Sequence, residues 1–149
     1  LDIPGANANG VYSANEYLTR IYLMEADKFP KFATPLYQGK KVAVIGAGNT
    51  AMDSMRTAKR LGADVTCYYR RSIDEAPARS EELKHAQQEM INWKWLSNPV
   101  EFITNEDNFI THIKCEKMEL SEPDESGRRV PVPTGEFFTD ECDTVVMSL

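Results

Sequence analysis

The chain has 149 residues, of which 42% are hydrophobic and 27% are charged, and these values are typical of a globular domain with one well-filled core. The net charge of −6 argues against general binding to nucleic acid or to a membrane surface, although it leaves room for a local basic pocket. No apolar run approaches the roughly 20 residues that cross a bilayer, and no signal peptide is visible. We therefore expect no membrane partner and a cytoplasmic location.

The first part of the chain predicts an N-terminal segment followed by a helix. Residues 1–12 are rich in glycine and proline and predict an extended segment. Ser13 and Glu16 have the spacing of a capping box, which predicts the start of a helix. This helix should end near Lys28, before Pro30.

Residues 42–53 predict a buried strand, a glycine turn and the start of a helix, the order in which a dinucleotide-binding βαβ unit begins. Gly46 can adopt the backbone angles of the tight turn, and Gly48 has no Cβ to hold a pyrophosphate away from the chain. Ala51 stands where the fingerprint allows glycine or alanine. The first N–H groups and the dipole of the helix attract the pyrophosphate. The candidate phosphate-binding residues are Gly46, Ala47, Gly48, Asn49, Thr50 and Ala51.

An arginine pair follows the next predicted strand. Helical periodicity predicts a helix over about 50–61 with Gly62 as its stop, and residues 63–69 then predict a strand. Arg70 and Arg71 come at the end of that strand, where an NAD site usually carries an acid. A guanidinium donates to phosphate oxygens, whereas a carboxylate would repel a 2′-phosphate. The pair therefore predicts NADP(H) as the cofactor.

Other interpretations of these residues remain open at this point. The glycine turn alone is also compatible with an ordinary strand-to-helix connection, and the arginine pair with a solvated strand end. The succession of strand, glycine turn, helix, strand and arginines favours the cofactor site. Arg79, before a predicted helix over 80–90, is a candidate third phosphate ligand or a solvated arginine at the helix start.

The second half of the chain predicts strands rather than helices. Four are expected, with turn residues between them, at 92–96, 100–104, 110–120 and 136–138. Residues 130–133 belong on a sheet edge or in a loop, because proline cannot donate to a central ladder. Residues 144–149 predict the last strand of a parallel sheet. The predicted fold is α/β and Rossmann-like, with a central parallel sheet and an antiparallel β-meander as one crossover.

The cysteines and histidines do not predict a metal site. Cys67, Cys115 and Cys142 are widely spaced in apolar sequence, which favours core thiols over a disulfide framework. His85 and His112 have no companion at ligand spacing. Since no C-x-x-C pair occurs, thiol–disulfide exchange is not expected either.

Motifs along nearly the whole chain carry a family resemblance. They are Ile3–Gly5, Gly10–Leu18, Gly46–Asp53, Tyr69–Arg71, Pro77–Arg79, Asn98–Val100, Glu122–Asp124, Ser126–Arg129 and Val145–Leu149. On these residues the chain resembles the NADPH-binding domain of the small (beta) subunit of bacterial glutamate synthase and its relatives. These belong to the flavoprotein class with two dinucleotide domains that includes thioredoxin reductase.

The resemblance implies one NADP(H)-binding domain over 1–149, with the N-terminal segment and helix over 1–38 and the Rossmann-like core over 39–149. Because the chain lacks an initial methionine and stops within an apolar run, we expect it to be part of a longer flavoprotein. The resemblance further implies that a hydride passes from NADPH to FAD, bound by another domain of the same polypeptide. Electrons would then pass through iron–sulfur clusters to a large synthase subunit or another acceptor.

No catalytic residue is predicted, because hydride transfer between nicotinamide and flavin needs orientation more than a protein acid or base. Glu82 is interpreted as a solvated acid at a helix start. Two alternatives for the function remain. One is an NADPH:ferredoxin or sulfide-type oxidoreductase subunit of the same family, and the other is a stand-alone NADP-binding sensor.

Overall fold

The computed structural model describes residues 3–24, 40–72, 84, 91–127 and 129–148. Five described strands form a parallel sheet with the spatial order β1-β8-β2-β3-β4. In chain order these strands are β1 (Val11–Ser13), β2 (Lys41–Ile45), β3 (Asp64–Tyr69), β4 (Asn92–Trp95) and β8 (Thr144–Met147). β2, which precedes the glycine turn, is therefore paired on both sides, by β8 and by β3.

An antiparallel meander lies between β4 and β8 in the chain, which confirms the expected crossover. Its strands are β5 (Ser97–Thr104), β6 (Ile110–Leu120) and β7 (Pro131–Glu141). β7 is an edge strand, which is the position in a sheet where prolines such as Pro131 and Pro133 are tolerated. The prediction of a strand at 136–138 is thus too short, since the residues assigned to an edge or loop are part of β7.

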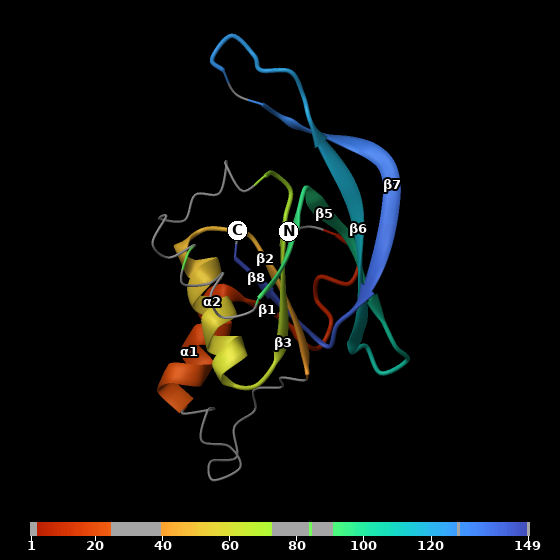
Figure 1. The fold of residues 1–149 in the computed structure, drawn as a ribbon. Helices are drawn as coiled ribbons and strands as arrows, with labels where there is room; N and C mark the ends of the chain where they lie inside the picture. Colours follow the sequence, from red (N-terminus) through yellow and green to blue (C-terminus); the bar gives the residue numbers. More distant parts are fainter. Residues whose placement is uncertain (1–2, 25–39, 73–83, 85–90, 128, 149) are drawn as a thin grey trace.

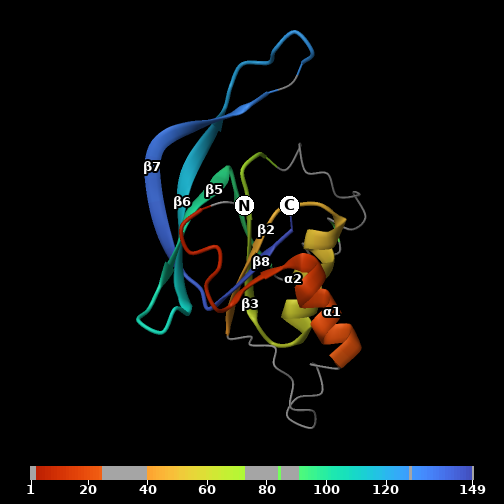
Figure 2. The same cartoon turned by 180° about the vertical axis from the view of Figure 1, so that it is seen from behind.

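The elements form three layers. α1 (Ala14–Met24) and α2 (Asn49–Arg60) lie on one face of the parallel sheet, and the meander lies on the other (Figures 1 and 2). Alternating residues of β2 contribute to the two cores: Val42 and Val44 pack on the helix side, and Ala43 and Ile45 on the meander side. Strands covered on both faces explain the continuous apolar run of β2. The fold is Rossmann-like α/β, as expected.

The predicted elements around the glycine turn agree closely with the structure. α2 differs from the predicted 50–61 by one residue at each end, and β3 begins one residue later than predicted. The Oγ of Ser13 accepts a hydrogen bond from the N–H of Glu16 at 3.2 Å, which is one half of the capping box. The first helix therefore begins where the sequence predicts.

Other expectations differ or fall outside the described part. The sequence predicts an extended segment over 1–12, but residues 3–8 form turns, in which the N–H of Ala6 donates to the carbonyl of Ile3 at 3.2 Å. Its last two residues, 11 and 12, form the edge strand β1 together with Ser13, through pairs such as Val11 with Val145. The predicted end of the first helix near Lys28 lies outside the described residues. The same holds for the predicted helix over 80–90, apart from Lys84.

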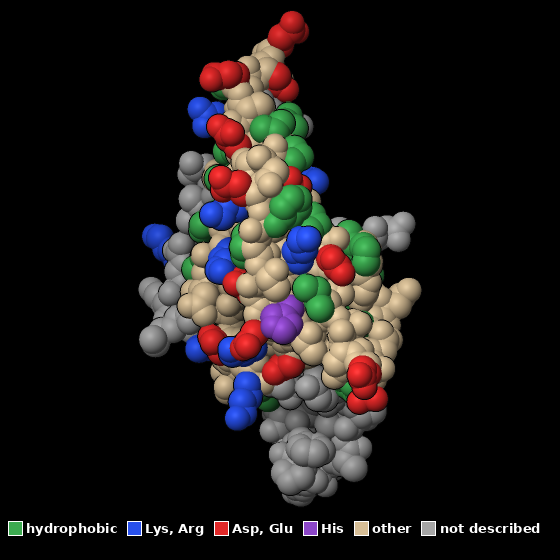
Figure 3. Space-filling view, turned by 90° about the vertical axis from the view of Figure 1, so that its right-hand side faces the viewer, with side chains coloured by type: hydrophobic (Ala, Val, Ile, Leu, Met, Phe, Trp, Pro, Cys, Tyr) green, Lys and Arg blue, Asp and Glu red, His purple; other side chains and the backbone are tan. Residues whose placement is uncertain are grey.

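The outer face of the meander carries apolar side chains among charged ones (Figure 3). Val132 and Phe137 of β7 are 40% and 52% exposed. The Nζ of Lys114 lies 5.1 Å from the centroid of the Phe137 ring, so a cation covers part of this aromatic side chain. Among the described helices, none is long and apolar enough to span a membrane.

Candidate dinucleotide-binding site

The glycine turn is fixed by the two strands beside β2. The N–H of Gly46 donates to the carbonyl oxygen of Tyr68 at 3.1 Å, and the N–H of Ser148 donates to that of Ile45 at 2.8 Å. The Gly46 φ angle is 121°, and a Cβ at this position would overlap the carbonyl oxygen of Ser148. The buried thiol of Cys67 donates to the Gly46 carbonyl at 3.1 Å. Both the backbone conformation and the close neighbour therefore require glycine at 46.

The helix that follows has no side-chain cap. Gly48 is the N-cap residue of α2, and no side chain forms a capping hydrogen bond there. Its φ of −84° and ψ of −179° are extended angles that any residue can adopt, so conformational freedom is not what glycine provides at 48. Ala51 is fully buried, in agreement with close packing between helix and sheet. The first N–H groups of a helix lack intrahelical acceptors, so this uncapped helix start is suited to an anion.

A cavity of about 450 Å³ opens beside the helix start, and we call it the glycine-turn cavity. It is lined by Ser13, Ala14, Asn15, Gly46, Ala47, Gly48, Asn49, Thr50, Tyr69, Met147 and Ser148. These residues come from the carboxyl ends of β1, β2, β3 and β8 and from the first residues of α1 and α2. The N-termini of two helices thus face one cavity.

A second cavity, of about 370 Å³, contains the arginine pair, and we call it the arginine cavity. It is lined by Ile45, Gly46, Tyr68, Tyr69, Arg70, Arg71, Asn98 and Pro99. Gly46 and Tyr69 also line the glycine-turn cavity, so the two cavities adjoin at these residues. Arg70 is exposed and Arg71 is half-buried, and neither forms an ion pair with any described residue. The Arg71 carbonyl accepts the N–H of Leu96 at 3.0 Å, which fixes the backbone beside the pair.

The structure brings most of the predicted site residues to these two cavities. Residues 46–50 line the first, Arg70 and Arg71 line the second, and Ala51 is buried behind the glycine turn. Arg79 and Glu82 lie outside the described residues.

Sequence reasoning missed the lining residues that come from other elements, namely β1, the start of α1, β3, β5 and the end of β8: Ser13, Ala14, Asn15, Tyr69, Asn98, Pro99, Met147 and Ser148. The rule that ligands bind at the carboxyl ends of parallel strands would have found several of them once the strand order was known. That order depends on β1 and β8, which are far apart in the chain.

The three cysteines are buried free thiols, which confirms the prediction of core positions. Burial raises the pKa of Cys115 and of Cys142 to about 12, and it also raises the pKa of Cys67. Each thiol is therefore protonated at neutral pH, and none of the three is suited to act as a nucleophile.

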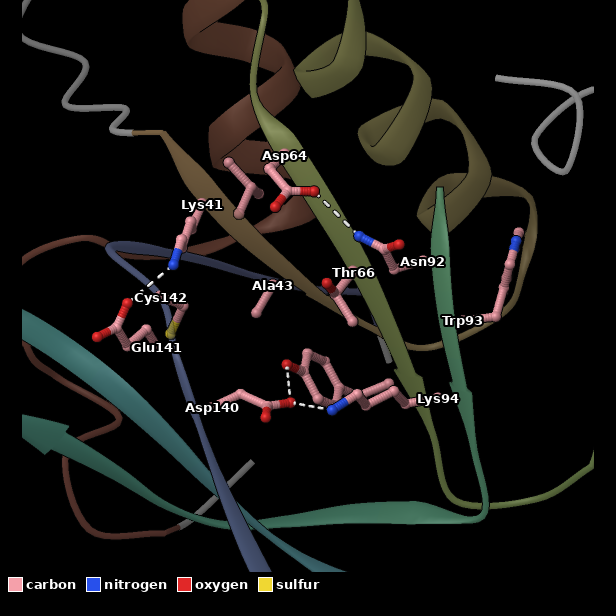
Figure 4. Close-up of a pocket in the computed structure, with 12 residues that line it drawn as sticks. Lys41, Ala43, Asp64, Thr66, Asn92, Trp93, Lys94, Asp140, Glu141 and Cys142 are labelled. Atoms are coloured by element: carbon pink, nitrogen blue, oxygen red, sulfur yellow. Dashed lines mark hydrogen bonds and ion pairs between the residues drawn. The ribbon is translucent and has the colours of Figure 1, made fainter. Parts of the chain in front are cut away.

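A third cavity, of about 480 Å³, lies toward the amino ends of β2 and β3, between the parallel sheet and the end of β7 (Figure 4). We call it the junction cavity. Its charged side chains bind one another: Lys41 to Glu141 at 2.8 Å and Lys94 to Asp140 at 2.6 Å. Asp140 also accepts the Tyr68 hydroxyl at 2.8 Å.

Another polar contact lies in the junction cavity: the side chain of Asn92 in β4 donates to the carboxylate of Asp64 in the neighbouring strand β3 at 3.0 Å. Burial, followed by the hydrogen bond to Asp140, raises the pKa of the Tyr68 hydroxyl. The Lys41–Glu141 and Lys94–Asp140 pairs and the Tyr68–Asp140 hydrogen bond join the end of β7 to the parallel sheet, so we assign the junction cavity to the scaffold rather than to the candidate site.

Comparison with known proteins agrees with this fold. The family model described as pyridine nucleotide-disulphide oxidoreductase matches residues 1–149. The beta subunit of NADP(+)-dependent formate dehydrogenase from Moorella thermoacetica is 46% identical over 118 residues, which cover 77% of this chain and 16% of that protein. A putative glutamate synthase (NADPH) small chain from Cereibacter sphaeroides is 37% identical over 155 residues, covering 100% of this chain and 36% of its own length.

Solved structures share the fold at lower identity. FprA from Mycobacterium tuberculosis has a TM-score of 0.76 at 20% identity, with 100% of this chain and 47% of FprA covered. Thioredoxin reductase from Lactococcus lactis has a TM-score of 0.69 at 22% identity, with 100% of this chain and 40% of that chain covered. This chain therefore spans less than half of the length of these relatives and structures. The family match over the whole chain and the 37% identity to a glutamate synthase small chain show that the chain belongs to the pyridine nucleotide-disulphide oxidoreductase family.

Proposed function

We propose that this chain is the NADPH-binding domain of a flavin-dependent oxidoreductase and holds NADPH for hydride delivery to FAD in another domain of the same polypeptide. The observation that carries the proposal is the meeting of the uncapped α2 N-terminus and the arginine pair at two adjoining cavities. Both cavities have volumes within the range of small-molecule sites, about 300 to 1,000 Å³.

The two helix starts in the glycine-turn cavity support a pyrophosphate at α2 rather than at α1. Ser13 caps α1 with its hydroxyl, whereas Gly48 has no side chain with which to cap α2. The N–H groups of the first turn of α2 therefore have capacity for an anion. A pyrophosphate there would gain from these donors and from the positive end of the helix dipole.

The arginine pair supports a preference for NADPH over NADH. A guanidinium binds a 2′-phosphate through charge-assisted hydrogen bonds, each worth about 1.5 to 3 kcal/mol. NADH has a ribose hydroxyl in place of this phosphate, so it would gain little from Arg70 and Arg71. The two arginines form no ion pair with a described residue, so no such ion pair would have to break when the 2′-phosphate binds.

NADPH, once bound, supplies the hydride, and the residues of this chain bind and orient it. The two relatives support this division of roles, because their names share NADP(H) and differ in the reaction, which involves formate in one and glutamate synthesis in the other. We accordingly propose that residues 1–149 form a single domain that binds the electron donor, NADPH. The electron acceptor, either a large synthase subunit or another protein reached through iron–sulfur clusters, belongs to the rest of the assembly.

Anaerobic rapid mixing of the intact protein with NADPH or NADH tests the proposal, with flavin absorbance as the signal. We expect NADPH to reduce the flavin. In the double variant Arg70→Ala with Arg71→Ala, half-maximal reduction should need roughly 10 to 100 times more NADPH, while the requirement for NADH stays nearly unchanged. Arg129→Ala is the matched control, because Arg129 is an exposed arginine that lines none of the three cavities.

Two results would contradict parts of the proposal separately. If NADPH binds but leaves the flavin oxidised, hydride delivery is wrong and the stand-alone sensor is favoured. If the double variant needs equally more NADPH and NADH for half-maximal flavin reduction, the arginine pair does not recognise the 2′-phosphate.

A further inference from the structure

Ser148 has a buried hydroxyl without a hydrogen-bond partner. Among the described residues, only the Oγ of Ser148 and the Nε1 of Trp93 are buried side-chain polar atoms in this condition. Buried hydroxyls are normally hydrogen-bonded, because an unsatisfied one loses its bonds to water without replacement. An alanine at 148 would avoid this cost, so a serine at this position calls for an explanation in terms of a ligand.

The backbone of Ser148 is held against the glycine turn on two sides. Its N–H donates to the carbonyl of Ile45 at 2.8 Å, and its carbonyl oxygen lies against the Cα of Gly46. Ser148 also lines the glycine-turn cavity together with residues 46–50. Its side chain is thus anchored directly beside the loop proposed to hold the pyrophosphate.

A serine hydroxyl in this place suits a phosphate group. Rotation about the single Cα–Cβ bond moves the hydroxyl between staggered positions, so a ligand in the cavity can recruit it without movement of the backbone. Phosphate oxygens are acceptors, and the hydroxyl is a donor whose bond to an anion is charge-assisted. The positive end of α2 attracts the same anion to this cavity.

We infer that the Ser148 hydroxyl donates to the pyrophosphate of the bound dinucleotide and is a further positioning residue of the site, an inference that rests on the proposed function. Ser148 and the arginine pair thereby bind different phosphate groups of the same ligand. The pyrophosphate lies against β2, α2 and the end of β8, and the adenosine 2′-phosphate lies against the end of β3. The two ends of the ligand are then held by different residues.

The test uses the intact protein with Ser148→Ala, titrated with NADPH and with adenosine 2′-monophosphate, which has no pyrophosphate. We expect Ser148→Ala to lower the affinity for NADPH by about tenfold and to leave the affinity for adenosine 2′-monophosphate unchanged. Without ligand, the thermal midpoint of this variant should equal or exceed that of the wild type, because the hydroxyl has no partner to lose.

Ser97→Ala is the matched control. Ser97 is also buried, but its hydroxyl donates to the Trp95 carbonyl at 3.2 Å, and it lines none of the three cavities. This control should lower the thermal midpoint and leave NADPH affinity unchanged.

The inference is overturned if Ser148→Ala binds NADPH as tightly as the wild type does, or if its affinities for NADPH and for adenosine 2′-monophosphate fall equally. It is also overturned if Ser148→Ala lowers the thermal midpoint without ligand as Ser97→Ala does. Failure of the wild type itself to bind NADPH would contradict the proposed function instead.

Discussion

The two edges of the parallel sheet differ in their polar groups. At the carboxyl edge the start of α2 has no side-chain cap, and the Ser148 hydroxyl is buried without a partner. At the amino edge, charged side chains form ion pairs, Lys41 with Glu141 and Lys94 with Asp140. Both edges open into cavities of similar volume, about 450 and 480 Å³. Volume therefore does not distinguish a binding site from a scaffold cavity in this chain. A buried polar atom without a partner does not distinguish them either, since Trp93, whose Nε1 is such an atom, lines the junction cavity. The charged groups do: Lys41 and Lys94 at the amino edge are paired with carboxylates, whereas Arg70 and Arg71 at the carboxyl edge form no ion pair with a described residue.

The largest expected effect is that of Gly46→Ala at the carboxyl edge. The φ of 121° and the overlap with the Ser148 carbonyl oxygen both oppose a Cβ at this position. We expect the free energy of unfolding to fall by about 2 to 4 kcal/mol and NADPH binding to be lost. Chemical denaturation and calorimetric titration measure the two effects.

Gly62→Ala is the matched control for this change. Gly62 also has a positive φ, 91°, but no heavy atom lies within 4 Å of the Cβ that would be added. We expect a loss of only about 1 kcal/mol, with NADPH binding retained. Equal destabilisation at both glycines would show that contact with Ser148 is unimportant.

The next effect concerns the amino edge and should separate stability from binding. Asp140→Ala removes the acceptor shared by Tyr68 and Lys94, at 2.8 and 2.6 Å. Because Asp140 is 27% exposed and Lys94 41% exposed, solvent weakens this pair, and we expect a loss of about 1 to 2 kcal/mol in the free energy of unfolding. NADPH affinity should stay unchanged, and a marked loss of affinity would place the junction cavity in the binding site.

The smallest effect is the pH dependence of the exposed pair at the same edge. Lys41 lowers the pKa of Glu141 below its ordinary value of 4.5, and Glu141 raises the pKa of Lys41 above its ordinary value of 10.5. The stabilisation by Glu141 is present above pH 4.5 and is lost as pH falls through its lowered pKa. The stabilisation by Lys41 is present below pH 10.5 and is lost as pH rises through its raised pKa.

Glu141→Gln should consequently have a slightly lower thermal midpoint than the wild type at pH 7, and this difference should shrink toward pH 3 and in high salt. Thermal melts of both proteins across pH measure it. A difference that grows on acidification would contradict the assignment of the charge pair.

The local part of the fold was accessible from the sequence, because neighbouring residues determine it. Gly46 has the positive φ that its place after a buried strand predicts, and α2 lies within one residue of its predicted bounds. The prediction for Gly48 concerned its missing Cβ rather than the turn, and its extended backbone leaves that as a prediction.

The non-local part could not be predicted in the same way. Ser13 and Ser148 reach the glycine turn because β8 pairs with both β1 and β2, and no short pattern encodes pairing across so much of the chain. β7 shows another limit: the prolines predicted a sheet edge or a loop at 130–133, and the structure confirms the edge for Pro131–Pro133, but the sequence did not indicate that the strand at 136–138 begins as early as Pro131.

Calorimetric titration of the wild type and of the double variant Arg70→Ala with Arg71→Ala, each with NADPH and with NADH, measures directly whether the arginine pair recognises the 2′-phosphate. We expect the wild type to prefer NADPH and the double variant to lose roughly 10- to 100-fold in affinity for NADPH, while its affinity for NADH is nearly unchanged. A wild type without preference, or equal losses for both nucleotides in the variant, would contradict this expectation.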